Sequence, residues 1–364
     1  MEALKTARMS STNIKEKTWL QYERNIQTLA RGFSGGQDYK NNDFLIMGRK
    51  QVIEFINKKS SSDAMKRMFY SVILIMLAPD KNDKKSQKTT DYKYYQRKLQ
   101  FFSQKYQDER ATQIKSVKQD TNWESWDDIL KLQHTLALEV KAMIKKNKLI
   151  GVRSITGEKF SKGSKLQKFG KDINRKQRTA LQNLVILSLY TLIKPRRLDY
   201  ANMEILSLKN YNNMSSEDRQ KSNFLVIVGK NKKFFSFGKQ AQKNQNRDKH
   251  GVKQPVYVLA VPSKLNSVLN MYLLFHPEDA FKKNFISRTF LYNTRGSAIS
   301  GDGLSKAMIK IMKARFKKNI SPTMLRTIYL SDKHKGDVGL EEKQTTAEEM
   351  GHTVATSNAN YQKK

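Results

Sequence analysis

Three short segments of the chain carry side chains that can bind a phosphate ester and attack it. Near the C-terminus, Tyr361 follows His352 by nine residues. Upstream, Arg326 stands inside an apolar segment, and the pair Arg196-Arg197 follows another. Arginine donates parallel hydrogen bonds to phosphate oxygens and keeps its charge at every physiological pH, and a tyrosine hydroxyl can form covalent intermediates. The chain has no cysteine, so a thiolate nucleophile is excluded.

The order and rough spacing of these segments resemble the signature boxes of the tyrosine recombinases, the phage-integrase family. Residues 350–352, Met-Gly-His, are similar to the family's (Leu/Met)-Gly-His box, which precedes the nucleophilic tyrosine by nine residues. Residues 321–331 resemble its His-x-Leu-Arg-x-x-(Tyr/Phe) helix, and residues 187–200 resemble its Gly-Leu-Arg-x-(Ser/Asp)-Glu box. The Pro-Arg-Arg-x-Asp-Tyr motif of residues 195–200 is most similar to that of the divergent family branch found in large DNA viruses and their satellite elements.

The resemblance implies a catalytic set made of Arg196, Lys239, Arg326, His352 and Tyr361. The two arginines would clamp the non-bridging oxygens of a scissile phosphate, which is electrostatic stabilisation of the transition state. Tyr361 would attack and form a 3′-phosphotyrosine that a free 5′ hydroxyl can reverse. Lys239 would protonate the leaving oxygen, and His352 would hydrogen-bond a phosphate oxygen or the leaving group. We expect this chemistry to be independent of metals and to use no cofactor.

Two of these assignments leave alternatives open. Arg196 stands three residues before Asp199, as the family's arginine stands before its glutamate, whereas Arg197 fits only if Asp199 fills the Ser/Asp place. We choose Arg196. For the lysine we choose Lys239, because residues 235–240 most resemble the family's strand-then-lysine segment. The same predicted hairpin also offers Lys230, Lys232, Lys233 and Lys243.

One position departs from the family pattern. The histidine that usually stands three residues before the second arginine is Thr323 here. This replacement removes a proton donor and a hydrogen-bond partner from the expected site. Catalysis would then depend more on the hairpin lysine as the acid.

The composition of the chain favours a partner with many negative charges. Lys and Arg number 69 against 33 Asp and Glu, which gives a net charge of +36, as in proteins that bind nucleic acid. The longest apolar stretch, residues 181–193, is interrupted by polar residues and is shorter than the roughly 20 residues of a spanning helix. Residues 1–11 lack the apolar core of a secretory signal. We therefore expect an intracellular protein with double-stranded DNA as partner, located in a host nucleus or at a viral replication site, and no membrane association.

The length of 364 residues suggests two domains. Apolar residues at helical spacing predict helices in residues 14–29 and in 63–76, the second ended by Pro79. The pattern restarts at Trp123, with Ser125 as a helix cap. We place a helical core-binding domain at residues 1–120 and a catalytic domain at residues 121–364.

Within the catalytic domain, residues 224–228, 234–237 and 256–261 have the apolar and β-branched character of strands. Helices are expected at 265–275, 304–316 and 323–330. The basic stretch 159–178 is either a solvated loop or a strap that contacts phosphates. The predicted fold class is mainly α with a small antiparallel β-sheet, arranged as a two-domain DNA clamp.

These features together favour a site-specific DNA recombinase or integrase that inserts a mobile or viral genome. We expect a homotetramer in the synaptic complex and a monomer or dimer away from DNA. One alternative with the same chemistry is a type IB topoisomerase, which nicks and reseals one strand. A second alternative, suggested by Thr323, is a catalytically silent DNA-binding accessory protein.

Overall fold

The computed structural model divides the chain into two compact units, Met1–Thr112 and Gln113–Lys364. It describes residues 1–12, 14, 16–33, 48–60, 62–154, 166–238, 256–277, 287–336 and 338–363. The division falls before the expected start of the second domain at residue 121. The short helix α7 (Val117–Thr121) consequently belongs to the second unit.

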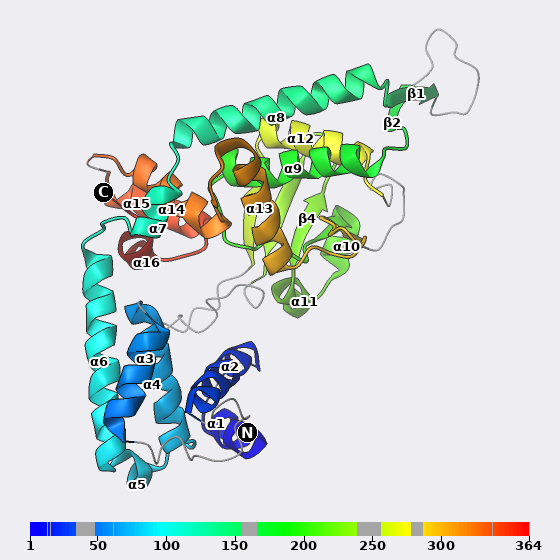
Figure 1. Ribbon diagram of the computed structural model, residues 1–364. Helices are drawn as coiled ribbons and strands as arrows, with labels where there is room; N and C mark the ends of the chain where they lie inside the picture. The colour runs from blue at the N-terminus through cyan, green and yellow to red at the C-terminus, as the bar shows by residue number, and fades with distance from the viewer. Residues whose placement is uncertain are drawn as a thin grey trace. The chain divides into compact units, whose positions relative to one another are not determined.

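The first unit is helical (Figure 1). Its helices are α1 (Glu2–Ser11), α2 (Glu16–Phe33), α3 (Arg49–Lys59), α4 (Asp63–Leu77), α5 (Lys84–Gln87) and α6 (Thr90–Ala111). The apolar helix α4 begins where the Ser62 side chain accepts a hydrogen bond from the backbone N–H of Met65, and it ends two residues before Pro79. It packs against α2, α3 and α6 and supplies half of the buried residues in this unit's core.

The second unit combines helices with a small sheet. Its helices are α7, α8 (Trp126–Lys146), α9 (Arg175–Thr191), α10 (Leu208–Asn213), α11 (Ser216–Lys221), α12 (Ser263–Leu274), α13 (Gly301–Phe316), α14 (Pro322–Lys333), α15 (Leu340–Glu349) and α16 (Val354–Asn360). The predicted cap of α8 is confirmed, because the Ser125 side chain accepts from the backbone N–H of Asp128. The predicted helices at 265–275, 304–316 and 323–330 are also confirmed as α12, α13 and α14.

The sheet of the second unit has five strands in the order β6-β5-β4-β3-β7. They are β3 (Glu204–Ser207), β4 (Asn223–Ile227), β5 (Lys233–Phe237), β6 (Tyr257–Ala260) and β7 (Arg288–Thr289). The prediction of an antiparallel sheet is wrong for one pairing, since β3 and β4 run parallel and the other pairs antiparallel. Helices α10 and α11 form a crossover between β3 and β4, and a crossover is what a parallel pair requires. The sheet is therefore mixed.

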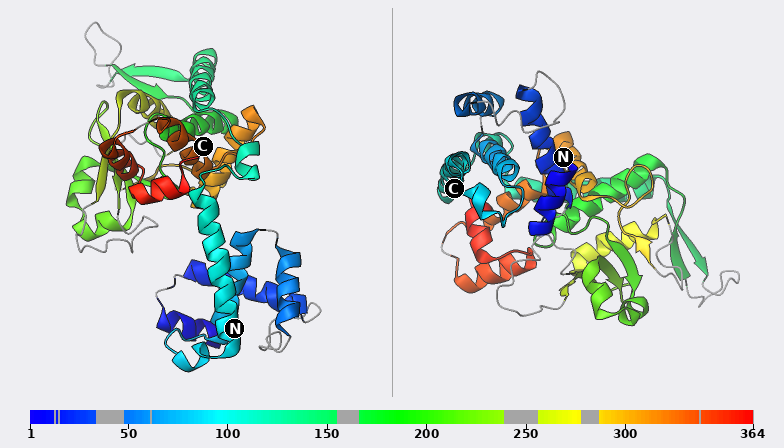
Figure 2. Two further views of the ribbon diagram at one scale, coloured as in Figure 1. Left: turned by 90° about the vertical axis from the view of Figure 1, so that its left-hand side faces the viewer. Right: turned by 90° about the horizontal axis from the view of Figure 1, so that it is seen from below.

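A separate hairpin pairs β1 (Ile150–Ser154) with β2 (Leu166–Gly170). Figure 1 shows it at the end of α8, and both views of Figure 2 show it at the edge of the second unit. Part of the predicted basic stretch forms β2 and the start of α9, while residues 159–165 lie outside the described residues. Among the described residues, no helix is long and apolar enough to cross a bilayer.

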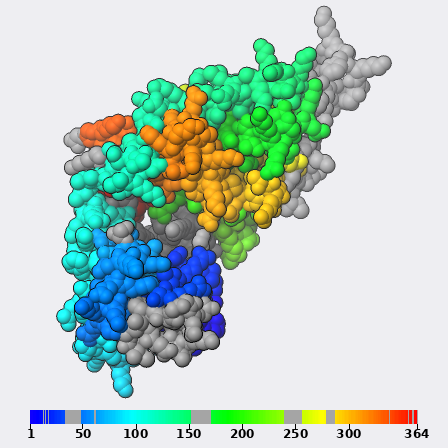
Figure 3. Space-filling model, in the orientation of Figure 1, coloured from blue at the N-terminus to red at the C-terminus, as the bar shows by residue number. Residues whose placement is uncertain are grey.

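Helix α9 is the central element of the second unit. Residues 184–190 are all buried, and the helix packs against α8, α12 and α13. Figure 3 shows α8, α9 and α13 together on one face of this unit. A helix buried around its whole circumference in its last turns gives a fixed starting point for the segment that follows, and this segment contains Arg196 and Arg197.

Candidate active site

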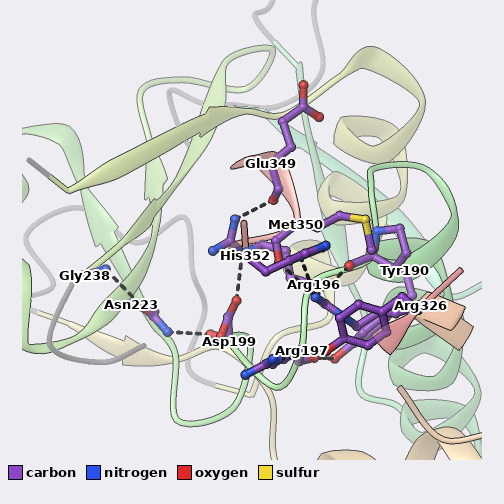
Figure 4. A network of polar contacts seen from close by, with 12 residues as sticks. Tyr190, Arg196, Arg197, Asp199, Asn223, Gly238, Arg326, Glu349, Met350 and His352 are labelled. Carbon is purple, nitrogen blue, oxygen red and sulfur yellow. Dashed lines mark hydrogen bonds and ion pairs between the residues drawn. The ribbon is translucent and has the colours of Figure 1, made fainter. Parts of the chain in front are cut away.

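Arg196 lies in the loop that follows α9 and is 1% exposed. Its Nε donates to Oδ2 of Asp199 at 2.8 Å, and its Nη1 donates to the backbone oxygen of Glu349 at 2.5 Å. The guanidinium carbon also lies 4.0 Å from the ring centre of Phe237 on β5. These contacts join the α9 loop, the sheet and the end of α15, so the cation is held rigidly (Figure 4).

Gly351 makes the close approach to Arg196 possible. Its φ of +71° is in the left-handed region, which side chains rarely adopt. A Cβ atom at this position would lie 2.6 Å from Nη2 of Arg196. The glycine of the Gly-His box is thus required both by backbone conformation and by contact with the first arginine.

Arg326 lies on α14 and is fully buried. Its Nη1 donates to the backbone oxygens of Pro195 at 3.1 Å and of Met350 at 2.9 Å. Its Nη2 donates to Nδ1 of His352 at 2.8 Å. Within the described part of the chain, Nε of Arg326 has no hydrogen-bond partner. This arginine therefore joins three segments, and its Nε–H is a donor that no described residue accepts.

The contact with Arg326 also fixes the state of His352. Arginine can only donate, so Nδ1 is the acceptor and Nε2 carries the proton. Burial, and then the charge of Arg326, lower the pKa of His352 to about 3. The ring is therefore neutral near pH 7, and its Nε2–H is buried without a hydrogen-bond partner among the described residues.

Tyr361 stands at the C-terminal end of α16 and is 5% exposed. Its ring centre lies 4.7 Å from the guanidinium carbon of Arg326 and 5.2 Å from the ring centre of His352. Its hydroxyl accepts a hydrogen bond from Nε of Arg197 at 3.2 Å. The structure thus brings four of the five predicted site residues together: Arg196, Arg326, His352 and Tyr361.

The fifth predicted residue, Lys239, lies outside the described residues. The residue before it is held near the first arginine by Asn223 on β4. Asn223 Oδ1 accepts from the backbone N–H of Gly238 at 3.0 Å, and its Nδ2 donates to the backbone oxygen of Asp199 at 2.8 Å. Asn223 therefore ties Gly238 to the loop of Arg196.

The other hairpin lysines are placed differently. Lys230 and Lys232 are exposed on the turn between β4 and β5, at the opposite end of β5 from Phe237, which contacts Arg196. A five-residue strand spans roughly 13 Å, so the turn lies about that far along β5 from Phe237.

Lys233 is 2% exposed, and its ammonium donates to the backbone oxygen of Lys230 and to Oδ1 of Asn266 and of Asn270. Burial lowers its pKa to about 8. Lys243 lies outside the described residues.

Thr323, at the usual histidine position, is exposed on the first turn of α14.

Two contacts of the site could not be predicted from the sequence. The sequence suggests Arg197 only as an alternative to Arg196 for the first arginine, yet Arg197 contacts the tyrosine hydroxyl. Asn223 could not be predicted, because nothing in a single sequence marks an asparagine that bridges two distant backbone segments.

No protein-family model, curated protein or solved structure matches the chain. The proposed function therefore depends on the arrangement of the arginines, the histidine and the tyrosine.

Proposed function

We propose that this protein is a DNA-cutting and rejoining enzyme of the tyrosine recombinase type, with Tyr361 as its nucleophile. The observation that carries the proposal is a pair of buried donors, Nε of Arg326 and Nε2 of His352, that have no partner within the described part of the chain. A buried donor without an acceptor is costly, by about 1 to 3 kcal/mol. Both donors belong to side chains that contact the Tyr361 ring. A phosphate oxygen that accepts from these donors would therefore lie close to the Tyr361 side chain.

The chemistry follows from these positions. The Tyr361 oxygen attacks the phosphorus, and the bond between phosphorus and the 5′ oxygen of the next nucleotide breaks. Arg196, Arg326 and the Nε2–H of His352 stabilise the charge on the non-bridging oxygens. Lys239 gives a proton to the departing oxygen. A 5′ hydroxyl that attacks the phosphotyrosine reverses every step, and this allows strands to be exchanged.

Tyr361 is favoured over Tyr329, the other tyrosine of the same apolar cluster. Burial, and secondarily nearby glutamates, raise the pKa of Tyr329 to about 12, which opposes formation of its phenolate. Its ring packs edge-on against Trp126. Tyr361 instead has a cation at its ring face and an arginine N–H at its oxygen.

The proposal includes the partner and the assembly. The net charge of +36 suits double-stranded DNA, with the helical first unit and the second unit both binding the duplex as a clamp. A homotetramer would form the synaptic complex, and the product would be an integrated mobile or viral genome.

Covalent trapping tests the proposal without knowledge of the DNA site. A random-sequence duplex library with a nick near its centre is incubated with the full chain, and covalent adducts are separated under denaturing conditions. We expect adducts from the wild type and from Tyr329→Phe, the matched control, and none from Tyr361→Phe with DNA binding retained. A nicked and resealed product without strand exchange would favour the topoisomerase alternative. Binding without any adduct would favour the silent accessory protein and refute the proposal.

A further inference from the structure

The two adjacent arginines after α9 serve different partners. Arg196 donates hydrogen bonds to the Asp199 carboxylate and to the Glu349 backbone oxygen. Arg197 is directed to the other side, where its Nε donates to the hydroxyl of Tyr361 at 3.2 Å. Figure 4 shows the two side chains diverging from neighbouring positions of the chain. Only the second arginine of the pair contacts the atom that would attack.

The backbone of Arg197 is fixed by the core. Its carbonyl oxygen accepts a hydrogen bond from the hydroxyl of Tyr190, a fully buried residue of α9. The ring of Tyr190 packs edge-on against Tyr200, which is also fully buried. Because the peptide is anchored on this aromatic pair, the guanidinium starts from a defined position and does not depend on DNA to be placed there.

We propose that Arg197 is an additional catalytic residue that activates the nucleophile. Its N–H holds the Tyr361 oxygen and stabilises the negative charge that develops there as the hydroxyl proton passes to water and the bond to phosphorus forms. The bond from phosphorus to the 5′ oxygen breaks in the same displacement, and that oxygen takes up a proton. This inference rests on the proposed function, and it assigns to Arg197 a role separate from the phosphate clamp of Arg196 and Arg326.

Single-turnover adduct formation at saturating protein measures the step directly, with a DNA sequence selected by the wild type. We expect Arg197→Ala to slow the step about 10²-fold, as for loss of one donor to a developing oxyanion. Arg197→Lys should recover part of the rate, because it restores the charge without the planar N–H geometry. Arg295→Ala, which removes a charge from an exposed turn, is the matched control and should retain the wild-type rate.

A structural role for Arg197 would also slow the reaction, so a second readout is needed. Difluorotyrosine has a more acidic phenol than tyrosine, and its installation at position 361 reduces the need for an activating donor. We expect it to raise the rate of Arg197→Ala by a much larger factor than it raises the rate of the wild type. Equal factors in the two backgrounds, or an unchanged rate in Arg197→Ala, would overturn the role of Arg197 while leaving the recombinase proposal intact. Absence of any adduct from the wild type would instead refute the proposed function, and the inference with it.

Discussion

Two buried cations of the second unit, Lys233 and Arg326, differ in whether all of their hydrogen-bond donors have an acceptor. All three N–H donors of the Lys233 ammonium have an acceptor, one backbone oxygen and two asparagine side chains. Arg326 also makes three hydrogen bonds, but its Nε has no partner among the described residues. In the same described ranges, the Nε2–H of the neighbouring His352 has no acceptor either.

The difference separates a structural cation from one that is prepared for a ligand. A cation whose donors are all satisfied can hold the β4–β5 turn against α12 and has no capacity left for a substrate. A buried donor without an acceptor lowers the stability of the free protein and recovers that cost when an anion arrives. Under the proposed function, Lys233 serves folding and the group around Arg326 serves chemistry.

The largest expected effect comes from Arg326→Lys. A lysine can donate to the three existing acceptors, as Lys233 does at its own site, but it has no counterpart to the free Nε. We expect adduct formation to slow by about 10²- to 10³-fold, with thermal unfolding close to that of the wild type. An Arg326→Lys variant that reacts at the wild-type rate would remove the distinction between the two cations.

Lys233→Met should have the reverse profile. The change leaves the side-chain oxygens of the buried Asn266 and the partly buried Asn270 without this donor, and we expect the free energy of unfolding to fall by about 2 to 3 kcal/mol. Denaturant titration measures this loss. The rate of adduct formation, measured at a temperature where the variant is folded, should not change. A slowed reaction in the fully folded Lys233→Met variant would show that Lys233 acts in catalysis.

Gly351→Ala tests whether the first arginine depends on the glycine beside it. The positive φ costs about 1 to 2 kcal/mol for a residue with a Cβ, and the methyl group must displace Arg196. We expect both the stability and the rate to fall. Gly339→Ala is the matched control, because a Cβ at residue 339 meets no atom within 4 Å. Equal behaviour of the two variants would contradict the role assigned to Gly351.

His352 should make the folded state sensitive to mild acid. Its pKa is lowered from 6.5 to about 3 in the folded protein, so below pH 6.5 the unfolded chain binds a proton that the folded chain does not. The stability that depends on neutral His352 is fully present above pH 6.5. As the pH falls below 6.5, the free energy of unfolding decreases, with a slope approaching about 1.4 kcal/mol per pH unit. Denaturant titrations between pH 7 and 5 should show this slope in the wild type and a shallower one in His352→Asn, whose amide oxygen can accept from Arg326 without titrating.

Much of this arrangement could be predicted from sequence where the signal is local. Apolar periodicity predicted α12, α13 and α14, and the residue types of β4, β5 and β6 predicted strands. The parallel strand β3 has only four residues and no alternation, so its pairing could not be read from the sequence. His352 and Tyr361 are separated by one short helix, and their spacing indicated that they could share a site. The contact of Arg197 with Tyr361 spans 164 residues and depends on how α9, α14 and α16 pack.

The central claim is that Tyr361 becomes covalently attached to DNA, and mass spectrometry of the trapped adduct tests it most directly. Trypsin cleavage after Lys343 and Lys363 releases a peptide of residues 344–363 whose only tyrosine is Tyr361, while Tyr329 falls in the separate peptide 327–333. After nuclease trimming, we predict a nucleotide mass on residues 344–363, with fragment ions that place it on Tyr361. A nucleotide on peptide 327–333, or on any other residue, would contradict the account.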